Sequence, residues 1–129
     1  MREIRFRAWD KKSKVMRGEV LSICWIDSFH CSRQIHVRSF YPQPNVYPLD
    51  DIELMQFIGL KDINGCEIYE GDIVKWTSTF EGSNDFEHID TVEWVEDMAV
   101  FMLRPWCHEI HAAKMEVIGN IYKTPELLK

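Results

Sequence analysis

The sequence contains no long hydrophobic run, and this absence limits the kinds of protein that it can encode. No apolar stretch approaches the roughly 18 to 20 residues that a membrane-spanning helix requires. Residues 1–5 carry three charged side chains and lack the apolar segment of a secretory signal peptide. We therefore expect a cytoplasmic protein. The 129 residues, of which 46% are hydrophobic, are enough for one domain with a core of its own.

Cysteines and glycines are also few. The four cysteines contain no Cys-x-x-Cys pair; they are Cys24, Cys31, Cys66 and Cys107. By number they allow two disulfides, but the reducing cytoplasm favours free and largely buried thiols. The six glycines are scattered singly, which excludes a glycine-rich loop that cradles phosphate.

Positive charge is scarce and unevenly distributed. The formal net charge of −6 argues against a nucleic-acid partner, because phosphate binding depends on Lys and Arg. Residues 1–50 have nine basic and five acidic side chains, whereas residues 51–129 have six basic and sixteen acidic ones. This asymmetry is either ordinary variation in surface charge or a source of attraction between subunits, which would favour a homo-oligomer.

The signals that are present indicate β-structure from the start of the chain. Apolar and polar residues alternate with a period of two in residues 4–9, and β-branched and aromatic residues dominate 20–26 and 35–41. A polar turn cluster at 10–14 separates the first two runs. These segments predict an N-terminal β-meander.

Prolines at positions 42, 44 and 48 interrupt this pattern. Because proline cannot donate to a strand ladder, the stretch around them predicts a loop or linker. We interpret residues 1–129 as a single domain. If it has two lobes, they are residues 1–48 and residues 54–129.

The second lobe begins with a β-hairpin that has two turn signals. Residues 54–60 form its first predicted strand, and Asn64-Gly65 then tolerates the positive φ angles of a type I′ turn. Gly71-Asp72 marks a second corner, directly before another strand. Strands joined at such corners bend a sheet sharply, as in small barrels.

Three further strands are predicted, at residues 91–95, 98–103 and 115–122, the last with a glycine bulge. The polar stretch 77–90 predicts a long exposed loop. Thr124-Pro125 predicts the N-cap and first residue of a short helical turn. Aromatic residues are expected to fill the core of this lobe: Trp76, Trp94, Phe101, Trp106 and Tyr122. The fold class is thus mainly β, with an N-terminal β-meander, a small SH3-like, partly open barrel and a short C-terminal helical turn.

Three segments in this order resemble the YopX family of small bacteriophage and prophage proteins: residues 2–10, 54–74 and 117–128. They span nearly the whole chain, although residues 24–46 and 77–113 match no family pattern. Cys66 stands where the family's hairpin has a polar or basic residue. The resemblance implies a phage or prophage origin, a bacterial host cell and a β-rich fold. It implies no activity and no catalytic residues.

The segment Cys107-His108-Glu109-Ile110-His111 groups side chains that can ligate zinc. The His-Glu-x-x-His motif of metalloproteases is absent, because Ala112 stands four residues after His108. On a strand, only alternate members of the segment would share a face. A further ligand would come from elsewhere in the chain: His88, Cys66 or His30. The alternative is a polar strand end beside Pro105, and we predict no metal site and no cofactor.

No other group of residues indicates catalysis. Cys31 with His30 or His36 would need an orienting third group to act as a nucleophile, and none is visible. General acid–base catalysis needs two carboxylates held across a cleft, which the sequence does not indicate. Asp72 after Gly71 is more typical of a turn. We predict that the protein is not an enzyme.

Basic residues near the N-terminus suggest an interface with nucleic acid: Arg2, Arg5, Arg7, Lys11, Lys12 and Lys14. Together with Phe6 and Trp9 they match the cations and aromatic rings that track a phosphate backbone and stack on bases. The acidic remainder of the chain and the expected burial of Phe6 argue against this interpretation.

Our leading hypothesis is a non-enzymatic, phage-derived β module that acts through protein contacts. Its partner would be a second copy of itself or an unknown phage or host protein, and not a membrane. The rival hypothesis is a nucleic-acid-binding β-barrel protein.

Overall fold

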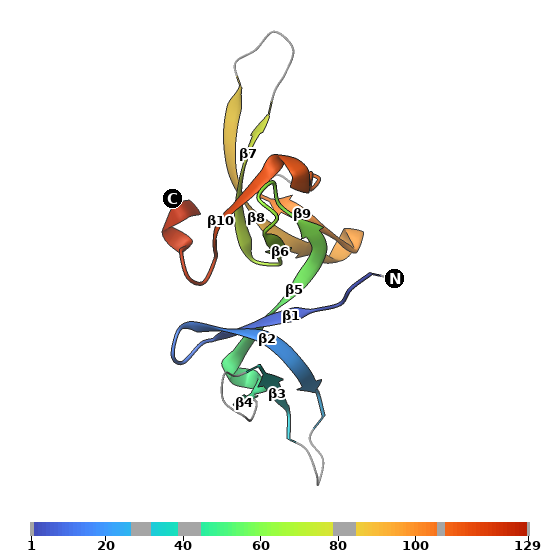
Figure 1. Cartoon of the computed structure of the whole chain (residues 1–129), viewed down its shortest axis with the longest axis vertical. Helices are drawn as coiled ribbons and strands as arrows, with labels where there is room; N and C mark the ends of the chain where they lie inside the picture. Colours follow the sequence, from blue (N-terminus) through green and yellow to red (C-terminus); the bar gives the residue numbers. More distant parts are fainter. Residues whose placement is uncertain (1, 27–31, 39–44, 79–84, 106–107, 129) are drawn as a thin grey trace. The chain divides into compact units, whose positions relative to one another are not determined.

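The computed structural model describes residues 2–26, 32–38, 45–78, 85–105 and 108–128. Its strands are β1 (Phe6–Asp10), β2 (Val15–Cys24), β3 (Gln34–Val37), β4 (Asn45–Pro48), β5 (Ile52–Lys61), β6 (Glu67–Tyr69), β7 (Asp72–Ser78), β8 (Phe86–Val95), β9 (Val100–Arg104) and β10 (Met115–Asn120). Its 3₁₀ turns are η1 (Leu49–Asp51), η2 (Glu96–Met98), η3 (Ala112–Lys114) and η4 (Pro125–Leu128). Figure 1 shows how these elements follow one another along the chain.

The strands form two antiparallel sheets, with the orders β4-β3-β2-β1-β5-β6 and β10-β7-β8-β9. The prediction of a mainly β fold is confirmed, and so is the short C-terminal turn, which is η4. The sheets stay open rather than closing into a barrel. Within the described residues, no helix has the length and apolar character needed to cross a bilayer.

The chain divides into two compact units. The first is Glu3–Gln56, and the second is Phe57–Lys129 together with Arg2. The division falls inside β5, whose first half pairs with β1 and whose second half pairs with β6. Each unit is described below by itself.

The first unit is the predicted meander, because β1 to β4 are neighbours in sequence order. Its core contains Ala8, Ile35, Val37, Leu49 and Ile52. The predicted proline loop is wrong for residues 45–48, which form β4 and pair with β3. β4 is an edge strand that ends at Pro48, and an edge tolerates a residue that cannot donate to the ladder.

Asp10 organises the turn between β1 and β2. Its carboxylate accepts hydrogen bonds from the Ser13 hydroxyl at 2.6 Å and from the Lys12 backbone N–H at 3.0 Å, and the Arg17 guanidinium lies at 3.1 Å. The Ser13 hydroxyl, with further backbone donors and Arg17, outweighs burial and lowers the pKa of Asp10 to about 2. The turn is therefore stabilised by an ionised side chain.

The cysteines depart from the predicted state. Cys24 is disulfide-bonded, so its prediction as a free thiol is wrong. Cys66 carries a reduced thiol, but it is exposed rather than buried. Cys31 and Cys107 lie outside the described residues.

In the second unit, the β5–β6 hairpin turns differently from the prediction. In the loop between the two strands only Gly65 has a positive φ, at 81°, whereas a type I′ turn would require a positive φ at Asn64 as well. The Gly65 N–H bonds to the Asp62 carbonyl at 3.0 Å, and the Asp62 N–H bonds to the Cys66 carbonyl at 2.7 Å. This is a three-residue loop with a left-handed glycine in its last position.

The Asp62 side chain explains this geometry. One oxygen accepts the N–H groups of Asn64 and Cys66, at 2.9 and 2.8 Å, and the other accepts the Val117 N–H of β10 at 2.9 Å. Burial would raise the pKa of Asp62, but these three donors lower it. One carboxylate thus shapes the hairpin and fastens it to a strand far away in sequence.

The corner at Gly71 and Asp72 joins β6 to β7. Gly71 has a φ of 84°, and its N–H bonds to the Val92 carbonyl at 2.8 Å. The buried Asp72 carboxylate accepts the Tyr69 N–H at 2.8 Å. Both residues therefore shape the backbone of the second unit.

The core of the second unit contains Ile68, Val74, Val92, Leu103, Ala112 and Met115. The predicted loop over 77–90 is wrong at both ends, because β7 continues to Ser78 and β8 begins at Phe86. Residues 79–84 lie outside the described part of the chain. The glycine bulge in the last strand is present, since the β10 register shifts between Val117 and Gly119.

Gly119 is required at this bulge by lack of space. A Cβ there would lie 2.0 Å from the Thr124 hydroxyl oxygen and 2.9 Å from a methyl carbon of Leu127. The Thr124 hydroxyl instead accepts the Asn120 N–H at 3.1 Å, which holds η4 against the end of β10.

Candidate functional site

The inner face of β8 is longer than the core that it covers. Residues 86, 88, 90, 92 and 94 share this face because side chains alternate along a strand. Val92 is fully buried in the middle, whereas Trp94 at one end is 45% exposed and Phe86 at the other is 57% exposed. The face thus continues beyond the core in both directions, and a cavity lies at each end.

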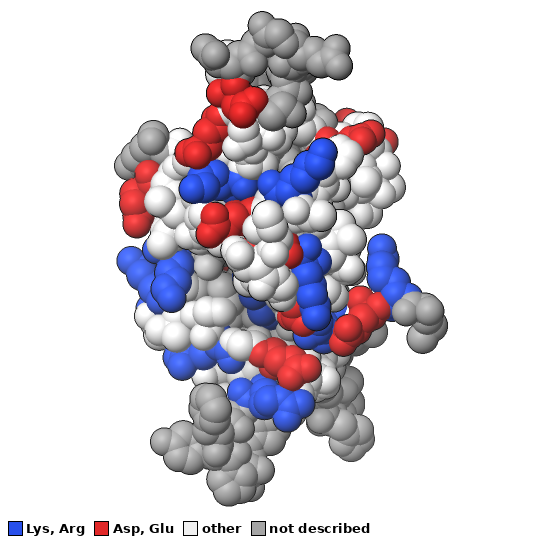
Figure 2. Space-filling view, turned by 45° about the horizontal axis from the view of Figure 1, so that its top comes forward, with Lys and Arg blue, Asp and Glu red and all other residues white. Residues whose placement is uncertain are grey.

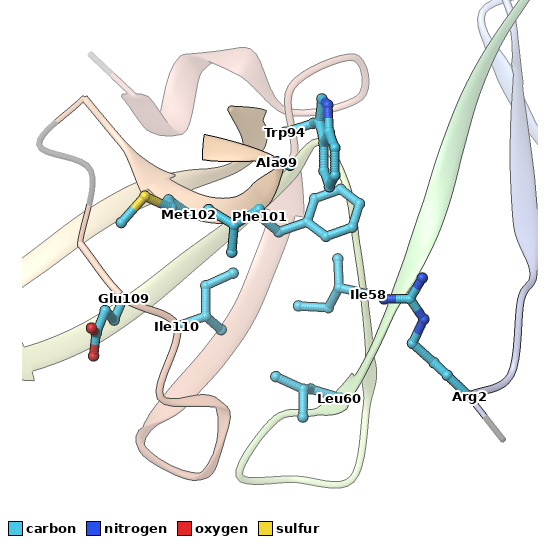
Figure 3. Close-up of a pocket in the computed structure, with 10 residues that line it drawn as sticks. Arg2, Ile58, Leu60, Trp94, Ala99, Phe101, Met102, Glu109 and Ile110 are labelled. Carbon is cyan, nitrogen blue, oxygen red and sulfur yellow. The ribbon is translucent and has the colours of Figure 1, made fainter. Parts of the chain in front are cut away.

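The cavity at the Trp94 end has a volume of about 470 Å³, and we call it the apolar groove. Its lining residues come mainly from β5, the β8–β9 hairpin and the segment after β9: Arg2, Ile58, Leu60, Trp94, Ala99, Val100, Phe101, Met102, Glu109 and Ile110. Figure 3 shows the side chains of Ile58, Leu60, Phe101 and Ile110 pointing toward one another. Eight of these ten residues have apolar side chains, and the other two, Arg2 and Glu109, are charged.

Strand pairing fixes the aromatic side chains of the groove. The backbone N–H and carbonyl of Leu103 both bond to His108, so they point away from β8. Leu103 and Val92 therefore form a non-hydrogen-bonded pair across β9 and β8, and so do Phe101 and Trp94, two residues along each strand. Side chains approach most closely in such pairs. The rings of Trp94 and Phe101 accordingly meet edge to face, with centroids 5.0 Å apart.

The same register leaves a short open edge on β9. The backbone N–H and carbonyl of Phe101 point away from β8, as those of Leu103 do. At Leu103 they are paired with His108, but at Phe101 no backbone bond joins this edge to another described residue. An open edge beside an apolar groove is suited to pairing with a further strand.

Opposite charges lie at the two ends of the groove. The Arg2 side chain packs beside Gly59: a Cβ atom placed on Gly59 would lie 3.7 Å from the Cγ and Cδ atoms of Arg2. Glu109 is largely exposed, with a carboxylate oxygen 3.7 Å from the His111 ring nitrogen. In Figure 3, the apolar side chains lie between Arg2 and Glu109.

The cavity at the other end of the β8 face has a volume of about 360 Å³, and we call it the histidine pocket. Its lining residues are Trp76, Thr77, Ser78, Phe86, His88, His108, His111, Lys114 and Met115. The described lining residues include one ammonium group and no carboxylate, and the Glu109 carboxylate lies just outside the lining, 3.7 Å from the His111 ring nitrogen.

The aromatic rings of the histidine pocket are held by specific contacts. The Trp76 indole N–H donates to the buried Asp90 carboxylate at 2.8 Å. The His88 ring stacks on Trp76 with centroids 4.2 Å apart, and a ring nitrogen of His88 lies 2.8 Å from the Ser78 hydroxyl. The rings of His108 and Trp76 pack edge to face, with centroids 5.2 Å apart. The wall of the pocket is therefore preorganised.

The structure brings together only part of the cluster at residues 107–111 and the distant residues considered with it as zinc ligands. The rings of His88 and His108 lie 6.1 Å apart, and His111 lines the same pocket. Cys107 and His30 lie outside the described residues. Within the described ranges, no three side chains of the ligating kinds come close enough to hold a metal ion.

The cysteine and histidines considered as a nucleophilic pair lie mostly outside the described residues, which exclude Cys31 and His30. His36 is half-buried in β3, where its ring nitrogen lies 3.2 Å from the Gln34 amide nitrogen. This contact gives His36 a structural role.

Most of the predicted nucleic-acid-binding residues lie beside carboxylates or in the sheet. Ion pairs join Arg5 to Glu3 at 2.8 Å, Lys12 to Asp51 at 3.2 Å and Lys11 to Glu53 at 3.7 Å. The face drawn in Figure 2 shows Lys and Arg interspersed with Asp and Glu.

The remaining members of that group differ in exposure. Arg7 is half-buried, with its guanidinium 3.6 Å from the Met55 sulfur, whereas Arg2 and Lys14 are exposed. Trp9 is only 7% exposed, so its ring is not available to stack on bases. Nucleic-acid binding by these residues stays a prediction.

Neither cavity follows from the local sequence patterns. They predict Trp94 in the core with Phe101, but of these two only Phe101 packs against the core. They predict Ser78 and Phe86 in a loop, whereas these residues lie in β7 and β8. The available signal for β8 is its content of β-branched and aromatic residues: Phe86, Ile89, Thr91, Val92 and Trp94.

Comparison with known proteins gives a family and a fold. A family model described as "YopX protein" matches residues 5–129. Among solved structures, the crystal structure of protein EF1440 from Enterococcus faecalis matches with a TM-score of 0.67 and 23% identity, covering 100% of both chains. At this identity the likeness shows the fold alone. No curated protein matches the chain.

Proposed function

The chain belongs to the YopX family, and we propose that it is a non-enzymatic β module that associates with a second copy of itself through the apolar groove. The proposal includes a phage or prophage origin, as the family resemblance implies, and a place in the cytoplasm of the bacterial host.

The observation that carries the proposal is the exposed inner face at Trp94. Apolar side chains from three elements converge there without being covered by the rest of the unit. Covering such a surface is favourable by about 25 cal/mol for each Å² of apolar area removed from water. An exposed apolar groove of this kind is typical of an interaction site.

The charges at the ends of the groove favour a second copy as the occupant. In a two-fold arrangement the same surface serves both partners, so Arg2 of each copy would meet Glu109 of the other. The open edge of β9 at Phe101 supports the same arrangement, because two antiparallel edges related by a two-fold axis can pair with each other. The excess of basic residues in 1–50 and of acidic residues in 51–129 adds a longer-range attraction between copies.

Sedimentation equilibrium of the full chain tests the proposal. Wild type is expected to dimerise, and Trp94→Glu is expected to be monomeric, because it places a charge in the groove. Ile63→Glu is the matched control, since Ile63 is an exposed apolar residue of the same unit outside the groove. A wild-type protein that stays monomeric at its highest soluble concentration would contradict the proposal.

A charge exchange tests the two-fold arrangement. Arg2→Glu and Glu109→Arg should each weaken the dimer, because each places like charges opposite one another. The double variant should restore it. If the double variant is weaker than both single variants, the copies do not meet in this way.

A further inference from the structure

We propose that the histidine pocket binds a small phosphorylated compound that carries a flat aromatic ring, such as a nucleoside monophosphate. This site lies at the other end of β8 from the apolar groove, and the inference does not depend on self-association.

The donors of the pocket fit a phosphate group. Lys114 and His111 belong to one turn, where the Lys114 N–H bonds to the His111 carbonyl at 2.9 Å, and both side chains are exposed. The Ser78 hydroxyl, on the same face of β7 as Trp76 and 2.8 Å from a ring nitrogen of His88, adds a further polar group. The Glu109 carboxylate lies 3.7 Å from the His111 ring nitrogen, so the Lys114 ammonium is the charge in the described lining that favours an anion.

The walls of the pocket fit an aromatic ring. Phe86 is 57% exposed, and Trp76 lines the pocket while its indole N–H is fixed by Asp90. Met115 adds an apolar surface. Stacking on such side chains is favourable for any base, because every base has a flat π face. The volume of about 360 Å³ is in the range of pockets that hold small ligands.

The arrangement does not favour a metal ion as the occupant. The described residues contain no group of three ligating side chains at a suitable separation. One nitrogen of His88 already lies within hydrogen-bond distance of Ser78. Organic phosphate uses the histidines and Lys114 together, whereas a metal ion would leave the Lys114 ammonium facing a like charge.

Titration of the full chain with adenosine monophosphate tests the inference. Binding is measured from the shift of the Trp76 indole N–H signal in NMR spectra. The nucleotide is expected to bind at least about tenfold more tightly than either adenosine or inorganic phosphate, because it engages both halves of the pocket. Lys114→Gln should weaken nucleotide binding by about tenfold, since a hydrogen bond to a charged group is lost.

Two matched controls separate this effect from general charge. Lys123→Gln removes a positive charge from the same unit outside the pocket lining, and His36→Gln removes a histidine from the first unit. Neither is expected to change nucleotide affinity. Circular dichroism confirms that each variant is folded.

Three results would overturn the inference. The first is no saturable binding of adenosine monophosphate. The second is equal affinity for the nucleotide and for inorganic phosphate, which would show that the ring is not recognised. The third is tight binding of an oligonucleotide without binding of the mononucleotide, which would assign the pocket to nucleic acid. The inference can fail in any of these ways while self-association at Trp94 stands.

Discussion

The two ends of the inner face of β8 differ in chemistry although one strand builds them both. At one end Trp94 and Phe101 extend the hydrocarbon of the core into the apolar groove. At the other, Trp76, Phe86 and Met115 continue the apolar surface, and imidazoles, hydroxyls and one ammonium group stand beside it. Between them, Asp90 and Val92 are buried.

The difference shows how one strand can serve two purposes. Only the middle of the face is covered by the core residues of the second unit, so the strand supplies rigidity there and exposed side chains elsewhere. An apolar end gains free energy when any matching surface covers it. The histidine end also offers apolar surface, from Trp76, Phe86 and Met115, but its donors must be matched as well, so we expect the histidine pocket to be the more selective site.

Both ends of β8 depend on the core of the second unit, which supports the middle of the strand. Leu103→Ala in this core is expected to have the largest effect on the free energy of unfolding. Leu103 is fully buried and pairs with Val92. Removing a core leucine costs about 2–5 kcal/mol of the free energy of unfolding. Urea unfolding measures the loss, and both sites should weaken with it. Val100→Ala, a half-exposed control on the same strand, should cost much less. A small loss for Leu103→Ala would mean that the ends are supported separately.

A second variant changes the stability of the second unit at a residue that lines neither cavity. Gly119→Ala should lower the free energy of unfolding by about 1–3 kcal/mol, because the new methyl group collides with the Thr124 hydroxyl. Adding Thr124→Ala should recover part of the loss, measured as a double-mutant cycle by urea unfolding. Strictly additive losses would contradict the contact that we assign to Gly119.

A third variant separates the two ends. Trp94→Ala should abolish self-association while leaving the affinity of the histidine pocket for nucleotide unchanged. Its cost in stability should be modest, because Trp94 is nearly half exposed. A double-mutant cycle with Phe101→Leu should give a coupling of about 0.5–1.5 kcal/mol for the ring pair. A coupling near zero would contradict the edge-to-face contact.

The smallest effect on the two ends of β8 is expected from a variant in the first unit, at Asp10. Because the folded pKa of Asp10 is about 2 and an unperturbed carboxyl titrates near 4, ionised Asp10 stabilises the fold above about pH 4. That contribution is lost as the pH falls toward 2. Asp10→Asn should flatten the pH dependence of urea unfolding in this window without changing either end of β8. An unchanged pH dependence would contradict the role of Asp10.

Local patterns predicted much of the fold. Alternation predicted the mainly β fold, the N-terminal meander and most of the strands. The hairpin turn was predicted in place but not in type, because Asp62 shapes it through a bond to Val117 on β10. No local pattern reports a contact between residues so far apart in sequence. β4 was missed because proline marks both loops and edge strands, and only pairing with β3 distinguishes them.

The candidate sites were harder to predict than the fold. Alternation places Trp94 on the core side of β8, but it does not reveal how far the covering residues extend. The histidine pocket depends on the register of β7 and β8, which sets Trp76 opposite His88, and on the return of His108 beside Leu103. From the sequence His88 is only a distant candidate ligand, because the polar stretch 77–90 predicts a loop where β8 begins.

One NMR experiment tests the central claim, that the two ends of β8 are separate sites with different occupants. The indole N–H signals of Trp94 and Trp76 are followed in one sample, first on dilution and then on addition of adenosine monophosphate. We predict that dilution shifts the Trp94 signal alone and that the nucleotide shifts the Trp76 signal alone. The claim is contradicted if dilution leaves Trp94 unchanged, if the nucleotide leaves Trp76 unchanged, or if either treatment shifts both signals together.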